Sequence, residues 1–550
     1  MADERMRPGR VGVRRGPRGG PSAASRRGPR RVRRAAALLL VAVLVATCGA
    51  GSPDRAAGPG WASPGLVGGG GWPFNSVPLS PAEAEGASYL PDSSVVRLGN
   101  GRIRFIPFGS DTPITVDPSD PRVAAAVRSD SAWLARGTVP GLTVPDITVP
   151  GVPRPGATGP GVPRPGVTGP PAPAPSPSAA VQAAPGPQGA KSAEAAKAAE
   201  AAEAAERNRD MAARALLDLR LLTRPNGASL ASWYGPWNFS WPRDSAFAAA
   251  AFAVSGHPAE GRRVLRFMAR VQHEDGLWAA RYNADGTAVA DGRPPQLDSL
   301  GWVLWASWFF RTQAPSSDLP ELWPMVRRAA DRLARSLDST GLPPPSSDYW
   351  ERGPGHEQDP DRPTLGVVGP VLAGLRSAAA IADGYGKHDK AARWRSASHR
   401  LSDAVGRDFA PHGYPRSPIA GGLMDTSVTF LGPPFGPADP AVDAAVANAA
   451  RKQALPNGGV LPGERWSGHK QVAWTPEMAL FTLSAATSGR TVEAHDRLGW
   501  LAEHSTSLGA LPEKVGERGQ PAGVAPLGWT ASLVVLSLAA LERPLPVPPA

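Results

Sequence analysis

The chain has 550 residues, and its net charge of +11 comes almost entirely from residues 1–34, where twelve arginines face two acidic residues. The rest is nearly neutral and offers no electrostatic footprint for a polyanion, so we exclude nucleic acid as a partner. The single cysteine, Cys48, excludes an internal disulfide and a thiolate zinc site. No two of the nine histidines have the spacing of helical metal ligands, so we expect no bound metal.

Residues 1–48 have the pattern of a basic n-region followed by a signal peptide. Arginine-rich residues 26–34 lead into twelve apolar residues, Ala35 to Ala46, a run too short to span a bilayer comfortably. The sequence Val-Ala-Thr-Cys that ends at Cys48 resembles a lipobox, which makes Cys48 the candidate lipidation site. We expect an exported protein, either associated with the cell envelope through this segment or extracellular; simple cleavage and an uncleaved anchor stay open.

Two low-complexity segments flank a short ordered piece. Residues 49–84 are rich in Gly, Pro and Ser and predict a tether. Residues 138–189 predict a linker, in which VPRPGATGP at 152–160 recurs as VPRPGVTGP at 162–170. Proline at this density favours an extended, semi-rigid spacer.

Residues 85–137, between these segments, predict a small ordered unit. Residues 94–98 and 102–106 favour a β-hairpin around a Gly-Asn-Gly turn. A helix is expected to follow, with Asp120 as its N-cap and Gly137 at its end.

Residues 190–545 predict one all-α domain. They are rich in Ala, Leu and Trp, show almost no alternation with a period of two, and place Gly, Pro, Asp and Trp in the loops. This pattern favours a toroid of helical hairpins with functional loops at one end. The expected pairs are 244–255 with 259–272, 300–313 with 322–337, 366–385 with 389–409, 441–454 with 476–488, and 492–505 with 527–541.

Three loops of this domain combine carboxylates with aromatic residues. Each charged residue has a structural alternative: a helix cap for Asp244 and a solvated loop carboxylate for each glutamate. Sugars present apolar faces and hydroxyl rims, so tryptophan faces beside a forked cation and a carboxylate suit a sugar site. The loops hold Trp241, Arg243 and Asp244, then Asp348, Trp350 and Glu351, and then Glu513, which is followed by Trp529.

Together these loops resemble glycoside hydrolase family 15, the glucoamylases and related α-glucosidases, from about residue 205 to 542. The resemblance implies an (α/α)6 toroidal barrel and an inverting reaction without a cofactor, with Glu351 as general acid and Glu513 as general base. Arg352 follows Glu351 where the family often has a second acidic residue. The sugar-binding residues that the resemblance implies are Trp241, Arg243, Asp244, Gln296, Asp298, Asp348, Trp350, Arg465 and Trp529.

The sequence therefore predicts an exo-acting, monomeric α-glucoside hydrolase that releases glucose from the non-reducing ends of α-linked glucans or oligosaccharides. A trehalase-like preference and a non-catalytic glucan-binding surface protein are the alternatives. A third alternative is a triterpene-cyclase-like barrel, because residues 272–278 resemble the Gln-x-x-Asp-Gly-x-Trp repeat of cyclases. There is one copy of that repeat and no Asp-x-Asp-Asp proton donor.

Overall fold

The computed structural model describes residues 81–107, 110, 112–140, 187–233 and 235–550. The signal peptide and lipidation site expected in residues 1–48 lie outside these residues, as do most of the expected tether and linker. All the described residues belong to one compact unit, Arg55–Ala550.

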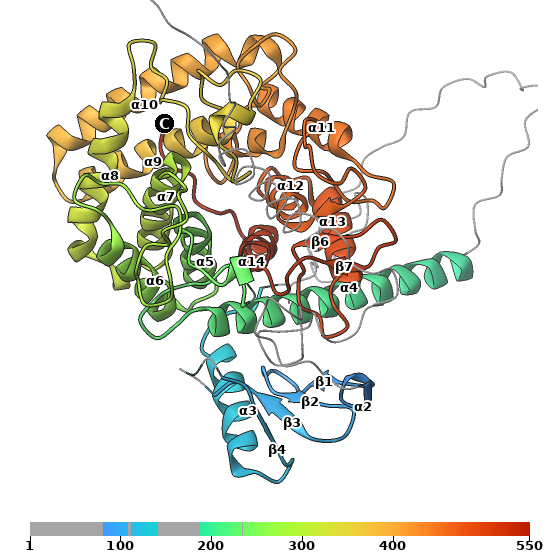
Figure 1. Cartoon of the computed structure of the whole chain (residues 1–550). Helices are drawn as coiled ribbons and strands as arrows, with labels where there is room; N and C mark the ends of the chain where they lie inside the picture. The colour runs from blue at the N-terminus through green and yellow to red at the C-terminus, as the bar shows by residue number, and fades with distance from the viewer. Residues whose placement is uncertain (1–80, 108–109, 111, 141–186, 234) are drawn as a thin grey trace, which may run out of the picture. The chain divides into compact units, whose positions relative to one another are not determined.

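Six elements form an inner ring in this unit (Figure 1). Each packs against its two ring neighbours and against an outer helix, so nearly all of its surface is buried. A helix in such a position is apolar all round, and every residue of the first ring member is buried. The ring consists of α5 (Pro242–Val254), α7 (Leu297–Gln313), α9 (Leu365–Gly384), the 3-10 helix η7 (Thr426–Leu431), α12 (Thr475–Thr487) and α14 (Gly528–Glu542).

Six outer helices surround the ring and bury one face each. In the outer helix Trp323–Ser336, the buried residues Met325, Val326, Ala329, Ala330 and Leu333 follow the spacing of a single helical stripe. The outer helices are α4 (Pro187–Leu222), α6 (Pro258–Val271), α8 (Trp323–Ser336), α10 (His388–Asp408), α11 (Pro440–Gln453) and α13 (Thr491–Glu503).

Six inner–outer pairs make this an (α/α)6 barrel, the fold class that the sequence predicts. The expected pairing is confirmed for α5 with α6, α7 with α8 and α9 with α10, and it is wrong for the rest. The inner element between α9 and α12 is η7, whose six residues are too few to show a helical period in the sequence. Consequently α11 pairs with η7, α12 with α13, and α14 with the N-terminal α4, which closes the ring (Figure 1).

The expected hairpin before the barrel is present within a four-stranded antiparallel sheet. Strands β2 and β3 pair Val96 with Arg104 and Arg97 with Ile103, and the turn between them contains Gly101 at φ +83°. The expected helix is α3, and the Asp120 side chain caps it by accepting from the backbone N–H of Arg122. The elements are α2 (Pro81–Ala84), β1 (Ser88–Tyr89), β2 (Val96–Arg97), β3 (Ile103–Phe105), β4 (Ile114–Val116) and α3 (Pro121–Leu134).

Specific contacts attach this small sheet and α3 to the barrel. Trp133 of α3 stacks on His257 at 3.8 Å between ring centroids and donates a hydrogen bond to Glu260 at 3.0 Å. Asp130 of α3 forms an ion pair with Arg220 of α4 at 2.5 Å. Burial lowers the pKa of His257 to about 4, so its ring stays neutral against the tryptophan.

Among the described residues, α9 is the one helix that is long and apolar enough to cross a membrane. It is also a ring helix, and 94% of its most apolar stretch is buried inside the unit. Its composition therefore follows from its place between α7, α10 and η7.

Candidate active site

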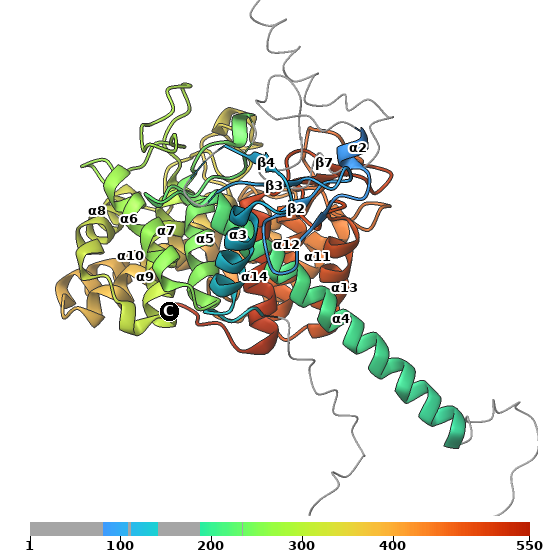
Figure 2. The same ribbon diagram turned by 90° about the horizontal axis from the view of Figure 1, so that it is seen from below.

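The N-termini of the ring elements meet at one end of the barrel. Contacts between first-turn residues show this directly: Arg243 of α5 reaches Asp298 of α7, and Thr475 of α12 lies 2.9 Å from Thr530 of α14, hydroxyl to hydroxyl. Helix N-termini present free N–H groups and a partial positive charge, which favours carboxylates there. Figure 2 shows the ring helices from the side, with the strand β7 (Pro521–Ala522) at this end and the C-terminus at the other.

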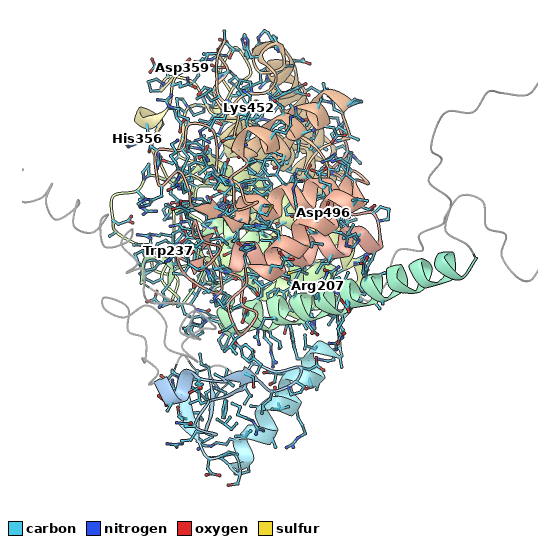
Figure 3. The ribbon with its side chains drawn as sticks, turned by 90° about the vertical axis from the view of Figure 1, so that its right-hand side faces the viewer. Arg207, Trp237, His356, Asp359, Lys452 and Asp496 are labelled. Atoms are coloured by element: carbon cyan, nitrogen blue, oxygen red, sulfur yellow. The ribbon has the colours of Figure 1, made fainter. Side chains whose placement is uncertain are left out.

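The loops that precede the ring elements cover this end. In Figure 3, Trp237 from the loop before α5 lies on the same side of the domain as His356 and Asp359 from the loop before α9, whereas Asp496 of α13 lies toward the other side. Gly/Pro-rich loops on a rigid helical scaffold are where sugar-binding and catalytic residues are expected.

Arg243 is the central cation of this site, and it is 4% exposed. Its guanidinium lies 3.0 Å from Glu351 Oε1. It also lies 3.3 Å from Oδ2 of Asp244 and 3.3 Å from Oδ2 of Asp298. One guanidinium cannot neutralise three carboxylates in a dry site. Burial raises the pKa of Asp244 to about 6 and that of Asp298 to about 7, against the opposing effect of Arg243.

Asp244 is not the helix cap that its position in the sequence allowed. Helix α5 begins at Pro242, and its N-cap is Trp241, which makes no side-chain capping bond. Asp244 lies one residue further inside the first turn than Arg243, and the two side chains face each other. This leaves its carboxylate available to the site.

Glu351, the expected general acid, lies on the loop before α9 with a left-handed backbone at φ +55°. Its second oxygen, Oε2, forms an ion pair with Arg293 at 2.7 Å, so both carboxylate oxygens face a guanidinium. Arg293 is partly exposed and also contacts Asp291 at 3.2 Å. Sequence reasoning missed Arg293, because it lies on the loop between α6 and α7 without an aromatic neighbour.

Asp348, expected among the sugar-binding residues, anchors this loop instead. It is fully buried, and Oδ1 accepts from the backbone N–H of Trp350 at 3.0 Å. Oδ2 accepts from Thr364 at 2.7 Å, and Arg416 forms an ion pair with the same oxygen at 2.9 Å. Protein groups therefore bind both oxygens, and the carboxylate presents no free acceptor to a sugar.

Arg416, which sequence reasoning missed, joins three loop carboxylates below the site. It is 3% exposed and forms ion pairs with Asp348, with Glu357 at 2.7 Å and with Asp425 at 2.6 Å. Its guanidinium also covers the ring of Trp350 at 3.9 Å. No residue near Arg416 in the sequence repeats the aromatic pattern of the three candidate loops, so its role is visible only in the folded chain.

Glu513, the expected general base, lies just before strand β6 (Lys514–Val515) and is 4% exposed. Two backbone hydrogen bonds fix it: its N–H donates to Val524 at 2.8 Å, and its carbonyl accepts from the N–H of Thr475 at 3.1 Å. The side chain forms an ion pair with Lys514 at 3.4 Å. Gly523, at φ +73°, packs so closely on the Glu513 carboxyl that a Cβ there would collide with it.

A row of three tryptophans connects the loops of the two glutamates. Trp350, next to Glu351, meets Trp466 edge-on at 5.2 Å, and Trp466 meets Trp474 at 5.0 Å. Trp474 belongs to β5 (Ala473–Trp474) and pairs across the sheet with Lys514, next to Glu513. The barrel thus brings together two carboxylates that lie far apart in the sequence.

Several polar atoms around these glutamates are buried without a hydrogen-bond partner in the protein. Buried polar groups normally have partners, so such a group marks a place where a polar ligand or water binds. All but one of the residues are sugar-binding candidates of the sequence or the expected base. The atoms are Nε1 of Trp241, Trp350 and Trp529, Oε1 of Gln296, Nη1 of Arg465, and Oε2 of Glu513 and Glu477.

The cyclase-like motif forms the turn after α6 and contributes no group to this site. The indole N–H of Trp278 donates to the Met268 carbonyl at 2.9 Å, and the Gln272 amide donates to the Gly276 carbonyl at 3.1 Å. Both side chains stabilise the backbone of α6 and of the turn that follows it, which is a structural role.

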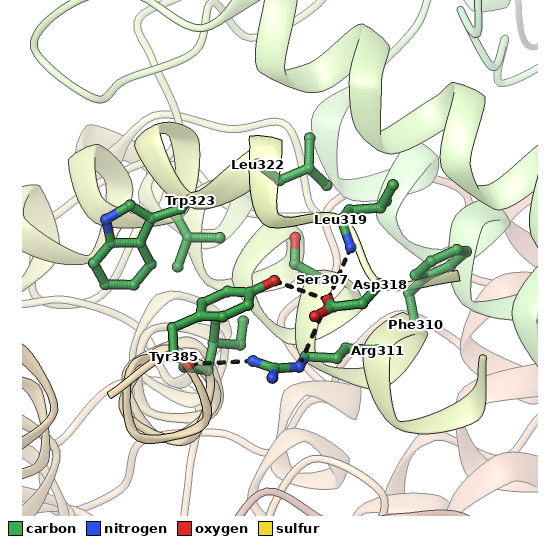
Figure 4. Close-up of a pocket in the computed structure, with 10 residues that line it drawn as sticks. Ser307, Phe310, Arg311, Asp318, Leu319, Leu322, Trp323 and Tyr385 are labelled. Atoms are coloured by element: carbon green, nitrogen blue, oxygen red, sulfur yellow. Dashed lines mark hydrogen bonds and ion pairs between the residues drawn. The ribbon is translucent and has the colours of Figure 1, made fainter. Parts of the chain in front are cut away.

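A small cavity near the other end of α7 differs in chemistry from this site (Figure 4). Its acid, Asp318, accepts a hydrogen bond from the Tyr385 hydroxyl at 2.8 Å and contacts Arg311 at 3.6 Å. Thirteen residues of α7 separate Arg311 from Asp298, about 20 Å of helix. We therefore place the site at the N-terminal end of the ring.

Residues 206–431 match the family model described as Glycosyl hydrolases family 15. This part of the chain is similar to glycosyl hydrolase family 15. The matched residues include Arg243, Asp244 and Glu351 and end before Glu513, so the role of Glu513 rests on its motif and its place in the barrel.

Two curated relatives of this chain are distant. An uncharacterized glycosyl hydrolase of Methanocaldococcus jannaschii is 24% identical over 359 residues, which is 59% of this chain and 54% of that protein. Isomaltose glucohydrolase of Kribbella flavida is 26% identical over 309 residues, 50% of this chain and 74% of that protein. The chain spans about half the length of the first of these relatives.

Solved structures show the same fold. A wild-type glycosidase is 20% identical, with a TM-score of 0.52, over 61% of this chain and 97% of that chain. A bacterial glucoamylase complexed with acarbose is 17% identical, also with a TM-score of 0.52, over 62% of this chain and 56% of that chain. At this identity the likeness establishes the (α/α)6 barrel and nothing further.

Proposed function

We propose that this chain is an exo-acting, inverting α-glucoside hydrolase, with Glu351 as general acid and Glu513 as general base. The observation that carries the proposal is that two glutamates from separate loops lie at one end of the ring, joined by three tryptophans and next to Arg243. Hydrolysis at an anomeric carbon requires two such carboxyl groups, one to protonate the leaving oxygen and one to activate water.

The names of the relatives support glucosides as the substrate class. One curated relative is an isomaltose glucohydrolase, one solved neighbour is a glucoamylase, and a glycosidase variant was solved in complex with glucose. The tryptophans and the unpartnered polar atoms at the site suit a sugar ring with several hydroxyl groups.

To act as the acid, Glu351 must present a protonated oxygen to the glycosidic oxygen. Both of its oxygens face guanidinium groups, from buried Arg243 and from the more exposed Arg293. We infer that a sugar bound in the leaving-group position displaces Arg293, because its loop is exposed and Arg243 is fixed. The freed oxygen then takes up a proton from solvent and passes it to the glycosidic oxygen as the bond from that oxygen to the anomeric carbon breaks.

Glu513 is placed to act as the base on the opposite face. Its Oε2 lies 3.4 Å from the Lys514 ammonium and accepts no hydrogen bond within the protein. A water held by this oxygen gives up its proton as it attacks the anomeric carbon, so the configuration inverts in a single displacement.

Exo-action is inferred from the floor of the site. Arg243 and Asp244 lie in the first turn of a buried ring helix, where they can bind hydroxyls of a terminal glucose. A glucan chain extended beyond that sugar would collide with the helix, so binding is restricted to a chain end.

Incubation with maltose, isomaltose, trehalose, dextrin and dextran, followed by NMR of the first product, tests the proposal. We expect glucose from at least one of these substrates, with the β-anomer appearing first. An α-anomer appearing first would overturn the inverting assignment. Internal cleavage of dextran to long fragments would overturn exo-action, and binding of dextrin without glucose release would identify a non-catalytic glucan-binding protein.

We also propose that the chain is exported and held at the cell envelope through lipidated Cys48. The support is the arginine-rich segment followed by twelve apolar residues and a lipobox-like sequence. The Cys48→Ala variant is expected to move from the membrane fraction to the soluble fraction. Unchanged partitioning would contradict lipidation.

A further inference from the structure

A third glutamate lies beside the two that the proposed mechanism uses. Glu477 is in the first turn of α12, a ring helix that contains no other charged residue, and it is 3% exposed. Its Oε2 is buried without a hydrogen-bond partner in the protein. Burying a carboxyl group in this way costs several kcal/mol unless the group is neutral or bound.

The backbone fixes Glu477 relative to Glu513. Thr475, two residues before Glu477, donates its N–H to the Glu513 carbonyl, and its hydroxyl donates to the carbonyls of Pro512 at 2.5 Å and Glu513 at 3.2 Å. Strand β5, directly before α12, pairs with β6, directly after Glu513. The first turn of α12 and the loop of the expected base therefore form one rigid unit.

Charged groups from three elements act on the Glu477 carboxyl. Burial raises its pKa to about 8, and the negative charges of Glu513 and Asp425 add to this effect, while the guanidinium of Arg243 opposes it. Tyr349, on the loop before α9, also interacts electrostatically with Glu477. Below pH 8 the group is therefore a neutral carboxylic acid, which can donate a hydrogen bond as well as accept one.

Structural roles do not account for Glu477. It does not complete a helix cap, because the N-cap residue Trp474 makes no side-chain capping bond and donates its backbone N–H to the Val460 carbonyl. Glu477 forms no ion pair with another described residue. Lys514, which follows Glu513 in the sequence, pairs with Glu513 instead. A leucine or methionine would fill the same buried place at lower cost.

We propose that Glu477 is a third carboxyl group of the sugar pocket and contacts the bound sugar as a neutral acid, donating its O–H to a sugar hydroxyl beside Glu513. The inference rests on the proposed function, which places a glucose there. A neutral Glu477 next to an ionised Glu513 avoids the repulsion between two close carboxylates. A sugar hydroxyl can then accept a hydrogen bond from Glu477 and donate one to Glu513.

Two substitutions at Glu477 test the inference. Glu477→Gln keeps the shape and a donor but cannot ionise, so kcat/KM at pH 6 is expected to stay within about threefold of wild type. Glu477→Leu removes the donor, and kcat/KM is expected to fall by roughly 10- to 100-fold. Neither variant should have a lower Tm than wild type. Glu503→Gln, an exposed residue at the end of α13, is the matched control.

The pH profile separates a sugar contact from a structural role. As the pH rises through about 8, wild-type Glu477 ionises and loses its donor, so kcat/KM should fall on the alkaline side. The general acid must also be protonated in every variant, so the Gln variant should show only the smaller alkaline loss that this acid causes, and the control should keep the full wild-type loss. Identical alkaline profiles for wild type and Glu477→Gln, or full activity in Glu477→Leu, would overturn the inference.

Failure of the proposed function would be recognised separately, because wild type would then release no glucose from any substrate of the panel. In that case calorimetric titration with glucose and acarbose decides the role of Glu477. Wild-type affinity is expected to fall above pH 8 and that of Glu477→Gln to stay constant. Equal pH dependence of the two affinities would overturn the inference.

Discussion

At the scale of single residues, the site is organised by an imbalance of charge around Arg243. One buried guanidinium faces Asp244, Asp298 and Glu351, and Arg293 supplies a second cation from an exposed loop. Burial keeps the pKa values of the two aspartates high. Protons are therefore held within the site near neutral pH, which a reaction that begins with proton donation requires.

Substitution of the two glutamates that we propose as acid and base should produce defects of different kinds. Glu351→Gln and Glu513→Gln are each expected to lower kcat on maltose or isomaltose by at least about 100-fold. An α-glucoside with a good leaving group needs little protonation, so it should partly restore turnover in Glu351→Gln. It should not restore Glu513→Gln, because the attacking water still lacks its base.

Steady-state kinetics on both substrate types measures this difference, with circular dichroism to establish that each variant is folded. Equal rescue of the two variants by the good leaving group would contradict the assignment of acid and base. Full activity in either variant would remove that glutamate from the mechanism.

At the scale of elements, the site depends on loops that are tied together beneath it. Arg416 joins the loop before α9, through Asp348 and Glu357, to the start of η7, through Asp425. The same loop carries Trp350 and Glu351 into the site. The position of the expected acid thus depends on a buried ion-pair cluster that does not itself touch the sugar.

Arg416→Met should therefore lower both stability and activity. Removing one partner of a buried ionic cluster leaves uncompensated carboxylates, and a loss of about 3–5 kcal/mol in the free energy of unfolding is expected. Arg362→Met, which breaks the more exposed ion pair with Asp408, is the control and should cost far less.

Urea denaturation of both variants measures the stability, and kcat below the unfolding transition measures the activity. We expect kcat to fall in Arg416→Met even where the protein is fully folded, because the Glu351 loop has lost its anchor. Unchanged kcat in the folded Arg416→Met protein would limit Arg416 to a stabilising role.

At the scale of the whole molecule, closure of the ring concentrates acidic groups in dry surroundings. The buried acids Asp298 and Glu477 have pKa values raised to about 7 and 8, far above the values near 4 expected in the unfolded chain. Folded protein therefore holds protons that unfolded protein has lost. The contribution of these bound protons to the free energy of unfolding is complete below about pH 4 and is lost as the pH rises to 8.

The Tm should consequently fall between pH 6.5 and 8. Buried His257 has the opposite effect, because its pKa is lowered to about 4, but that effect is complete once the pH exceeds the unfolded value of about 6.5. A decrease of roughly 2–5 °C is expected over this window. Calorimetry in buffers of matched ionic strength measures it, and the Glu477→Gln variant should show a smaller decrease. A Tm that rises from pH 6.5 to 8 would contradict the charge states assigned to these acids.

The sequence by itself determined the fold class and the candidate loops. Apolar and amphipathic helical stretches with Gly, Pro, Asp and Trp in the loops between them are a local pattern that predicts an all-α toroid of helical hairpins. The resemblance to family 15 implied that this toroid is an (α/α)6 barrel. The aromatic and acidic residues of the three candidate loops lie within a few residues of Arg243, Glu351 or Glu513 in the sequence, so they also form local patterns. These patterns need no knowledge of distant contacts.

The tertiary structure alone decided which distant residues act together. The six residues of η7 carry too short a pattern to reveal a ring position, so the pairing of α11 to α14 could not be derived locally. Arg293, Arg416 and Glu477 have their partners in other loops, and their roles follow from the closure of the barrel. Asp348 belongs to a recognised motif, yet its burial and its partners make it an anchor of the loop before α9. Only the packing of the folded chain decides which carboxylate oxygens remain open to a ligand.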